Sequence, residues 1–324
     1  MRNGLASVAW LAERLGQPNL RVVDATWFLP NSPFAAPAPY ASGREAFEAG
    51  PRVPGAAFWD LDEHSDATTA PDTPHNLPDA AQFAAAAAAC GIGSADQRVV
   101  CYDQVGTFSS PRLWHTLRAY GFADVAVLDG GLPAWVEAGG ALEAGAPTAA
   151  PAAGAAAPYA LVAGAQWRLG DVREWLATDA AKRPQFVDAR PAGRFEGSAP
   201  EPRPGCRSGH APGAVNAPFL DFLEPNPSRA DGGPGGPFRG ATLKDDRGVA
   251  EAFAAAGVDP AAPCALSCGS GLTAAVVALA LHRLEGNDAP IYDGAWCEYE
   301  ADGCLLYTSP SPRDATLSRM PSSA

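Results

Sequence analysis

The sequence contains an internal duplication, and this constrains its fold more than any other feature. Four segments of the first half recur in the same order in the second half. The matched pairs are RVVDATWF (21–28) with QFVDARPAGRFEG (185–197), GREAFEAGPRVPGAAFWDLD (43–62) with SGHAPGAVNAPFLDF (208–222), RVVCYDQVGTFSSPRLWHTLRAYG (98–121) with CALSCGSGLTAAVVALALHRL (264–284), and VAVLDGGLPAWVEAGG (125–140) with APIYDGAWCEYEADG (289–303). A repeat on this scale predicts two similar domains.

The repeated segments also indicate the fold class. Short apolar runs that end in aspartate, such as Val22-Val23-Asp24 and Phe186-Val187-Asp188, alternate with alanine-rich patterns of helical period. Alternating strands and helices are typical of α/β domains with a largely parallel sheet. We therefore predict an α/β protein with two similar domains, each a mainly parallel sheet flanked by helices.

Composition sets the boundaries of these domains. The first is expected over residues 5–140 and the second over 159–303, joined by a linker at 141–158 that is rich in Ala, Pro and Gly. A Gly/Pro cluster at 228–240 predicts a surface loop within the second domain. The tail at 304–324 continues neither repeat and resembles a translated cloning or sequencing adaptor, so we expect it to be disordered.

Charge and cysteine content exclude several classes of function. The chain has 324 residues and a net charge of −13, which argues against nucleic acid or an anionic membrane as the main partner. Its seven cysteines include no CxxC spacing, so neither a disulfide scaffold nor a zinc site is expected. No signal peptide, transit peptide or membrane-spanning run is visible. We expect a cytoplasmic protein without a metal or organic cofactor, with the mitochondrion as the alternative location.

One cysteine stands where reactive chemistry is favoured. Cys268 follows a short apolar run, and the loop Gly269-Ser270-Gly271-Leu272-Thr273 then leads into a helical pattern from Ala274. A thiolate is stabilised by backbone N–H groups and by a helix N-terminus, and the glycines permit a tight loop whose amides face inward. Ser270 and Thr273 add hydroxyl donors. The alternative is a buried structural cysteine at a strand-to-helix turn. In the first repeat the same position is Asp103, so only the second carries a thiol there.

At this point the sequence resembles the tandem-domain rhodanese family. The resemblance rests on the loop at 268–273, on ARPAGRFEGSAPEPRPGCRSGHAPGAVNAPF (189–219) and on FSSPRLW (108–114), the signature of the inactive half. It implies two rhodanese-like domains, of which the first is inactive. It also implies that Cys268 takes sulfur from a donor, becomes a persulfide and passes the sulfur to a thiol or to cyanide. A dithiol protein such as thioredoxin is the acceptor implied.

Loop charge separates the branches of this family. Members that use thiosulfate carry cationic side chains in the loop, whereas Gly269, Ser270, Gly271 and Leu272 are uncharged. The neutral loop resembles the branch whose donor is 3-mercaptopyruvate. Arg194 and Arg203 match the family's substrate-binding arginines, and a guanidinium suits a carboxylate beside a keto oxygen. The alternative for each arginine is a surface salt bridge, with Glu196 or Glu201 as partner.

The resemblance also places an aspartate and a histidine of the inactive half near the reactive cysteine. FWDLDEHSDATTAPDTPHNLP (58–78) corresponds to that region and points to Asp62 and His75. His64 competes with His75, and Asp60 is the candidate for a structural turn residue. An Asp62–His75–Ser270 relay would deliver a proton to the enolate left when sulfur departs. The alternative is that His75 is a polar loop residue.

Other functions remain alternatives. One is thiosulfate:cyanide sulfur transfer, and another is a non-catalytic sulfur-carrier or binding module, which an Asp or Ala at position 268 would have favoured. Cysteine phosphatases close their anion loop with an arginine, but position 274 is Ala and the next arginine is Arg283, which argues against phosphate chemistry. Cys297 and Cys304 are candidates for redox partners or are incidental. Cys206 lies beside the arginine segment without an assigned role.

Overall fold

A computed structural model describes residues 4–30, 32, 34–37, 39–66, 73–147, 159–226 and 238–303. In the first half the elements are β1 (Leu5–Ala6), α1 (Val8–Ala12), β2 (Leu20–Asp24), α2 (Gly43–Ala49), β3 (Ala57–Phe58), α3 (Ala80–Ala89), β4 (Arg98–Tyr102), α4 (Ser110–Ala119), β5 (Val125–Leu128) and α5 (Gly131–Glu137). In the second half they are β6 (Gln166–Trp167), α6 (Leu169–Ala177), β7 (Gln185–Asp188), α7 (Ala192–Glu196), β8 (Val215–Asn216), η1 (Phe219–Phe222), β9 (Leu223–Glu224), β10 (Thr242–Leu243), α8 (Asp246–Ala256), β11 (Cys264–Ser267), α9 (Ala274–Glu285), β12 (Ile291–Tyr292) and α10 (Ala295–Ala301).

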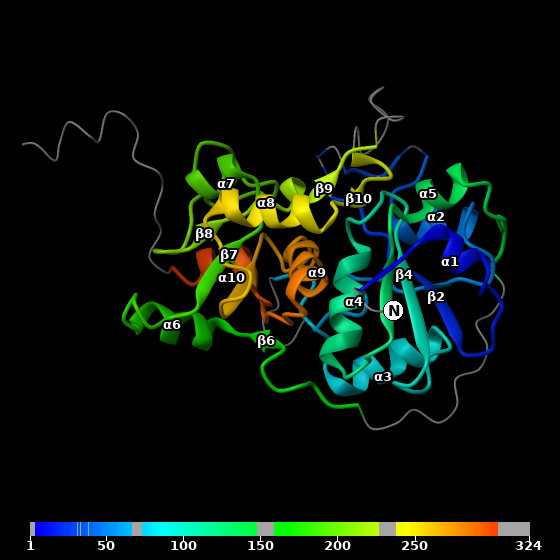
Figure 1. Ribbon diagram of the computed structural model, residues 1–324, viewed down its shortest axis with the longest axis horizontal. Coiled ribbons are helices and arrows are strands. Elements are labelled where there is room, and N and C mark those ends of the chain that lie inside the picture. Colours follow the sequence, from blue (N-terminus) through cyan, green and yellow to red (C-terminus); the bar gives the residue numbers. More distant parts are fainter. Residues whose placement is uncertain are drawn as a thin grey trace, which may run out of the picture.

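The two halves form two five-stranded sheets with the same topology. Their strand orders are β1-β5-β4-β2-β3 and β6-β12-β11-β7-β8, and neighbouring strands within each sheet are parallel. Every strand of the first sheet therefore has a counterpart at the same place in the second. The predicted fold class, two α/β domains with parallel sheets flanked by helices, is confirmed. Figure 1 shows the halves side by side.

The central strands place the two corresponding loops. β4 and β11 occupy the third position of their sheets. Asp103 follows β4 and Cys268 follows β11, so each residue stands at the carboxyl end of a central parallel strand, the edge where α/β proteins bind ligands. The alignment of Asp103 with Cys268 thus holds in three dimensions.

Helices α4 and α9 join the halves. They follow the two corresponding loops and lie side by side at the centre of the molecule (Figure 1). Their apolar faces share one hydrophobic core, in which Leu113 and Leu117 of α4 and Leu279 and Leu281 of α9 are completely buried. This packing brings the first half close to the Cys268 loop.

The short antiparallel pair β9–β10 extends the second half toward the first. The backbone N–H of Gly240 donates to the carbonyl of Val105, and that of Leu243 donates to the carboxylate of Asp129. Most of the predicted surface loop at 228–240 lies outside the described residues, as do most of the linker at 141–158 and the tail at 304–324. The predicted domain boundaries therefore stay predictions. Within the described ranges, no helix is long and apolar enough to cross a membrane.

Candidate active site

The Cys268 loop lies between β11 and α9, where the sequence predicts it. Cys268 is almost fully buried, and α9 begins at Ala274 after Thr273. Gly271 has φ of +75°, a left-handed conformation that favours glycine. A Cβ on Gly269 would lie 2.8 Å from Nη2 of Arg194. Both glycines are therefore required, one for the backbone turn and one for the close approach of a guanidinium.

Helix α10 supports this loop from the other side. The backbone N–H of Trp296 donates to the carbonyl of Cys268 over 3.0 Å, and that of Cys297 donates to the carbonyl of Gly269 over 3.2 Å. The carbonyls of Cys268 and Gly269 are thereby bonded to α10. The loop is left free to present N–H groups to an anion.

Ser270 contacts a histidine of the first half. Its Oγ lies 3.0 Å from Nδ1 of His75, and Nε2 of the same ring lies 3.0 Å from Oδ1 of Asp62. The indole N–H of Trp27 also donates to Asp62, at 3.0 Å from Oδ2. His75 is buried, and its φ of +67° is uncommon outside glycine. The structure therefore brings Asp62, His75 and Ser270 into one hydrogen-bonded chain across the boundary between the halves.

The surroundings favour neutral His75 and ionised Asp62. Burial lowers the pKa of His75 below its usual 6.5, although the hydrogen bond and charge of Asp62 oppose this shift. Burial raises the pKa of Asp62, but the hydrogen bond and charge of His75 together with Trp27 lower it overall. A carboxylate that accepts from Nε2–H leaves Nδ1 free to accept from the Ser270 hydroxyl.

The structure places His64, the alternative to His75, and Asp60, the candidate turn residue, outside the hydrogen-bonded chain of Asp62, His75 and Ser270. The His64 ring packs edge-on against Trp59, with 5.2 Å between ring centroids. Asp60 accepts backbone N–H groups from Asp62 and Glu63, as a turn residue does. The prediction of His75 over His64 agrees with this geometry.

Two arginines line the pocket beside Cys268. Arg194 reaches from the end of α7, and Arg203 comes from the segment that follows. A Cβ on Gly269 would also lie 3.8 Å from Nη1 of Arg203. Arg194 forms an ion pair with buried Glu201 through Nη2, and its Nε–H donates to Glu201 over 2.9 Å. Arg194 therefore lines the pocket and also pairs with Glu201, in a largely buried ion pair rather than on the surface, and its role in binding substrate stays a prediction.

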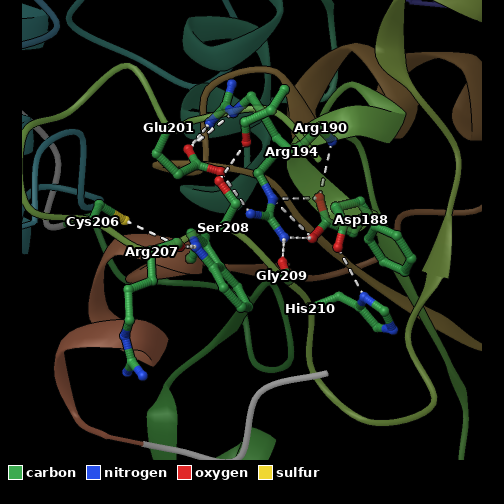
Figure 2. Close-up of polar contacts among 12 residues, drawn as sticks. Asp188, Arg190, Arg194, Glu201, Cys206, Arg207, Ser208, Gly209 and His210 are labelled. Atoms are coloured by element: carbon green, nitrogen blue, oxygen red, sulfur yellow. Dashed lines mark hydrogen bonds and ion pairs between the residues drawn. The ribbon is translucent and has the colours of Figure 1, made fainter. Parts of the chain in front are cut away.

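Glu201 belongs to a larger ionic network. Its Oε1 accepts from Arg190 over 2.8 Å, and Arg190 also pairs with Asp188 at the end of β7 over 2.6 Å. Figure 2 shows Glu201 joining the two guanidinium groups. The Arg190 guanidinium lies 4.1 Å from the ring centroid of Trp296 on α10. This network fixes Arg194 relative to the helix that supports the Cys268 loop.

Arg112 of α4 reaches the same loop from the first half. Its Nη1–H donates to the carbonyl of Gly271 over 3.3 Å, and its Nη2 donates to the carbonyl of His75 and to Oδ1 of Asp293, each over 2.5 Å. Asp293 in turn accepts from the N–H of Leu77 over 2.5 Å. One buried guanidinium therefore links the Cys268 loop, the backbone of His75 and the side chain of Asp293.

The corresponding loop of the first half is built around a carboxylate. Oδ1 of Asp103 accepts from the N–H groups of Val105 and Gly106, and Oδ2 accepts from those of Phe108, Ser109 and Ser110 and from the Ser110 hydroxyl, over distances of 2.6 to 3.0 Å. This loop is an anion cradle already filled by its own side chain. It supports the interpretation that the loop at 268–273 can cradle an anion.

The pocket combines both halves. Trp27, Leu29 and Phe108 line it from the first, and Arg194, Pro202, Arg203, Cys268, Gly269, Ser270, Leu272 and Thr273 line it from the second. Of the residues predicted to bind substrate, five line this pocket, namely Arg194, Arg203, Gly269, Leu272 and Thr273, whereas Gly271 does not. Sequence analysis did not single out Trp27, Arg112, Asp293 or the part played by Glu201. The one available signal was a charged residue, Arg112, directly before the stretch LWHTL (113–117).

Three comparisons with known proteins point to one group. The model of the rhodanese-like domain matches residues 7–138. The human protein named 3-mercaptopyruvate sulfurtransferase is 38% identical over 306 residues, which cover 91% of this chain and 91% of the relative. An Arabidopsis thaliana protein named thiosulfate/3-mercaptopyruvate sulfurtransferase 1, mitochondrial, is 35% identical over 313 residues, 91% of this chain and 75% of the relative. The crystal structure of SseA from Escherichia coli, titled as a 3-mercaptopyruvate sulfotransferase of the rhodanese fold, matches with a TM-score of 0.72 and 31% identity, over 91% of this chain and 99% of that one.

Proposed function

This chain belongs to the tandem-domain rhodanese family of sulfurtransferases, and we propose that it moves sulfur from 3-mercaptopyruvate through a Cys268 persulfide to a thiol acceptor. The observation that carries the proposal is the 3.0 Å contact between His75 and Ser270. It unites residues of both halves at a buried cysteine whose pocket holds two arginines. The names of the human and bacterial relatives supply the substrate.

Cys268 is the nucleophile of the proposed reaction. Its thiolate attacks the sulfur of 3-mercaptopyruvate, the bond between that sulfur and the methylene carbon breaks, and its electron pair remains on the carbon as the enolate of pyruvate. Protonation of that carbon gives pyruvate, and the transferred sulfur stays on Cys268 as a persulfide. Backbone N–H groups of the loop and the N-terminus of α9 would stabilise the anionic sulfur in this step.

The chain of Asp62, His75 and Ser270 handles the proton. Neutral His75 accepts through Nδ1, so a proton released in the pocket moves from Ser270 Oγ to the imidazole while Asp62 stabilises the resulting cation. The same route in reverse delivers the proton to the enolate carbon. No proton has to enter from bulk water during the step.

Charge in the pocket fits a substrate with one carboxylate. Arg194 and Arg203 supply two positive charges, and Glu201 offsets one of them. A net charge of about one suits a 2-keto carboxylate, which the planar guanidinium groups can bind at its carboxylate and keto oxygens. A dianion such as thiosulfate would be compensated less completely.

The acceptor we propose is a thiol, with cyanide as a substitute. A dithiol such as thioredoxin would take the outer sulfur of the persulfide, release it as hydrogen sulfide and become a disulfide. All six cysteines of the described residues are free thiols, which suits a reducing compartment. We propose the cytoplasm, with the mitochondrion as the alternative because one relative is named as mitochondrial.

The test compares sulfur release from 3-mercaptopyruvate and from thiosulfate, with a dithiol acceptor, in the wild type and in Cys268→Ser. We expect faster turnover of 3-mercaptopyruvate, loss of turnover in the variant, and a gain of one sulfur atom in the mass of the donor-treated wild type. A preference for thiosulfate would favour the thiosulfate:cyanide reaction instead. A folded wild type that gains no sulfur from either donor would support a binding module.

A further inference from the structure

Two cysteines outside the catalytic loop lie next to each other. Cys206 belongs to the segment between α7 and β8, and Cys297 lies in the first turn of α10. The Cys206 thiol donates to the carbonyl of Arg207 over 3.9 Å and also interacts with the sulfur of Cys297, although 90 residues separate the two cysteines in the sequence. Both are half-buried free thiols.

Further contacts fix this neighbourhood independently of the thiols. The carbonyl of Arg207 accepts from the indole N–H of Trp296 over 2.7 Å, and the Arg207 guanidinium pairs with Glu300 over 2.5 Å. Cys206 also packs against the hydrophobic cluster that contains Trp296. The segment around 206–207 is therefore docked on α10, and Figure 2 shows Cys206 and Arg207 beside the network of Glu201.

Cys297 lies in surroundings that favour a thiolate. The hydrogen bond from Cys206 lowers the pKa of Cys297 to about 7 against the effect of burial, and the positive charges of Arg203 and Arg194 lower it further, while the charge of Glu201 opposes them. The same hydrogen bond and burial raise the pKa of Cys206. One member of the pair is thus suited to attack a disulfide and the other to resolve the product.

We propose that Cys206 and Cys297 are a reversible disulfide site that links the segment carrying Arg203 to the helix supporting the Cys268 loop. The oxidant is a small-molecule disulfide. The Cys297 thiolate attacks one of its sulfurs and expels one thiolate. The Cys206 sulfur then attacks Cys297, its proton goes to the leaving thiolate, and the second thiol departs. Two protein thiols lose two electrons, and one disulfide is reduced to two thiols.

The position of the pair gives the disulfide a consequence for the pocket. Cys206 follows Arg203 closely, and its N–H donates to the Arg203 carbonyl over 3.4 Å. Cys297 is bonded through its backbone to Gly269. Closing a covalent bond pulls these two supports together and displaces Arg203 relative to Cys268. Displacements of about 1 Å at a reacting site lower catalysis strongly. This part rests on the proposed function.

The disulfide itself is tested without catalysis. Full-length protein with Cys268→Ser and Cys304→Ser is equilibrated in buffers of increasing oxidised-to-reduced glutathione ratio, alkylated, digested without reduction and analysed by mass spectrometry. We expect one cross-linked peptide that joins Cys206 to Cys297 and is lost on addition of dithiothreitol. The matched control is the buried neighbouring pair Cys90 and Cys101, which we expect to stay unlinked. Glutathione bound to either cysteine singly, or two free thiols in the most oxidising buffer, would overturn the proposal.

The effect on the pocket is tested with Cys268 intact. Cys304→Ser protein is compared with the same protein carrying Cys206→Ser or Cys297→Ser. We expect oxidation to raise KM for 3-mercaptopyruvate about fivefold or more in the first protein and to leave both serine variants unchanged. An equal loss in all three would assign the effect to Cys268 and refute the coupling. Lack of activity in every reduced protein would refute the proposed function and leave the mapped disulfide standing.

Discussion

Arg112 of the first half forms a buried ion pair with Asp293 of the second half, and the same guanidinium donates to the carbonyls of His75 and Gly271. A single side chain thereby links the backbone of His75 to the loop that contains Cys268. Arg118, also on α4, likewise crosses between the halves, but it pairs with Asp288 at a more exposed site. Arg118 therefore serves to hold the two halves together, whereas Arg112 also aligns His75 with the Cys268 loop.

Arg112→Lys should lower kcat for 3-mercaptopyruvate about tenfold to a hundredfold, because a lysine keeps the charge but cannot make all three contacts at once. KM should change less, since Arg112 does not line the pocket. Arg118→Lys is the matched control and should retain kcat. Steady-state kinetics and thermal unfolding of both variants check this. Equal losses of kcat and stability in the two variants would assign Arg112 a general structural role.

Asp62→Asn should move the acidic limb of the pH profile to lower pH. Asp62 raises the pKa of His75 through its hydrogen bond and charge, while burial lowers it. Removing the carboxylate leaves burial unopposed, so His75 protonates at a still lower pH and is a weaker base. We expect kcat to fall about a hundredfold to ten-thousandfold, the usual contribution of a positioned acid or base. Profiles of kcat/KM from pH 4 to 8 in the wild type and the variant would test the direction of the shift. An acidic limb at the same pH in both proteins would show that His75 does not take part in the rate-limiting proton transfer.

Glu201→Gln should shift the preference between donors. The variant releases Arg194 from its counter-charge and makes the pocket more positive. A dianion gains more from this than a monoanion, so kcat/KM for thiosulfate should rise relative to that for 3-mercaptopyruvate. Glu196→Gln, at an exposed position in α7, is the matched control. The ratio of the two kcat/KM values is the measurement, and an unchanged ratio would show that Glu201 acts only on the position of Arg194.

Asp24 should make the first domain less stable as pH rises toward neutrality. It is completely buried, and burial raises its pKa from 3.8 to about 7. Between these values the folded chain holds a proton that the unfolded chain has released, so the free energy of unfolding falls with rising pH. The slope is at most about 1.4 kcal/mol per pH unit and disappears above about pH 7.

Asp24→Asn should abolish that slope and stabilise the domain at pH 8. Its amide oxygen can still accept from the N–H and hydroxyl of Thr26, as the carboxyl does now. Urea unfolding at pH 5, 6, 7 and 8 measures the effect, with Asp96→Asn as the exposed control. A variant with the wild-type slope would place the titrating group elsewhere.

The fold could be predicted because its signals are local and occur twice. Strands that end in aspartate, the glycine loop after Ser267 and the helix from Ala274 are each encoded within a few residues, and the structure places their counterparts identically in the two sheets. The positions of Cys268 and Asp103 followed from that repeat. The arginines and the Asp62–His75 pair came from the resemblance to a family.

The remaining features depend on contacts between distant residues. Arg112 and Asp293 are 181 residues apart, and the sequence around either residue does not predict that the two form a pair. Trp27 reaches Asp62 only because β2 and β3 are neighbours in the sheet. The choice of Glu201 over Glu196 as the partner of Arg194 depends on how the chain turns after α7 ends. Spacing in a sequence does not encode such pairings, since they arise when the two halves pack together.

The side chain of Asp103 fills the loop of the first half at the place where the second half holds the sulfur of Cys268. The N–H groups of Val105, Gly106, Phe108, Ser109 and Ser110 therefore already have a partner within the chain. The loop of Cys268 has no such carboxyl group, and under the proposed reaction it alternates between thiol, thiolate and persulfide. In the duplicated protein, one loop is thus filled by its own side chain, whereas the other loop holds a sulfur whose charge changes once in every cycle of the proposed reaction.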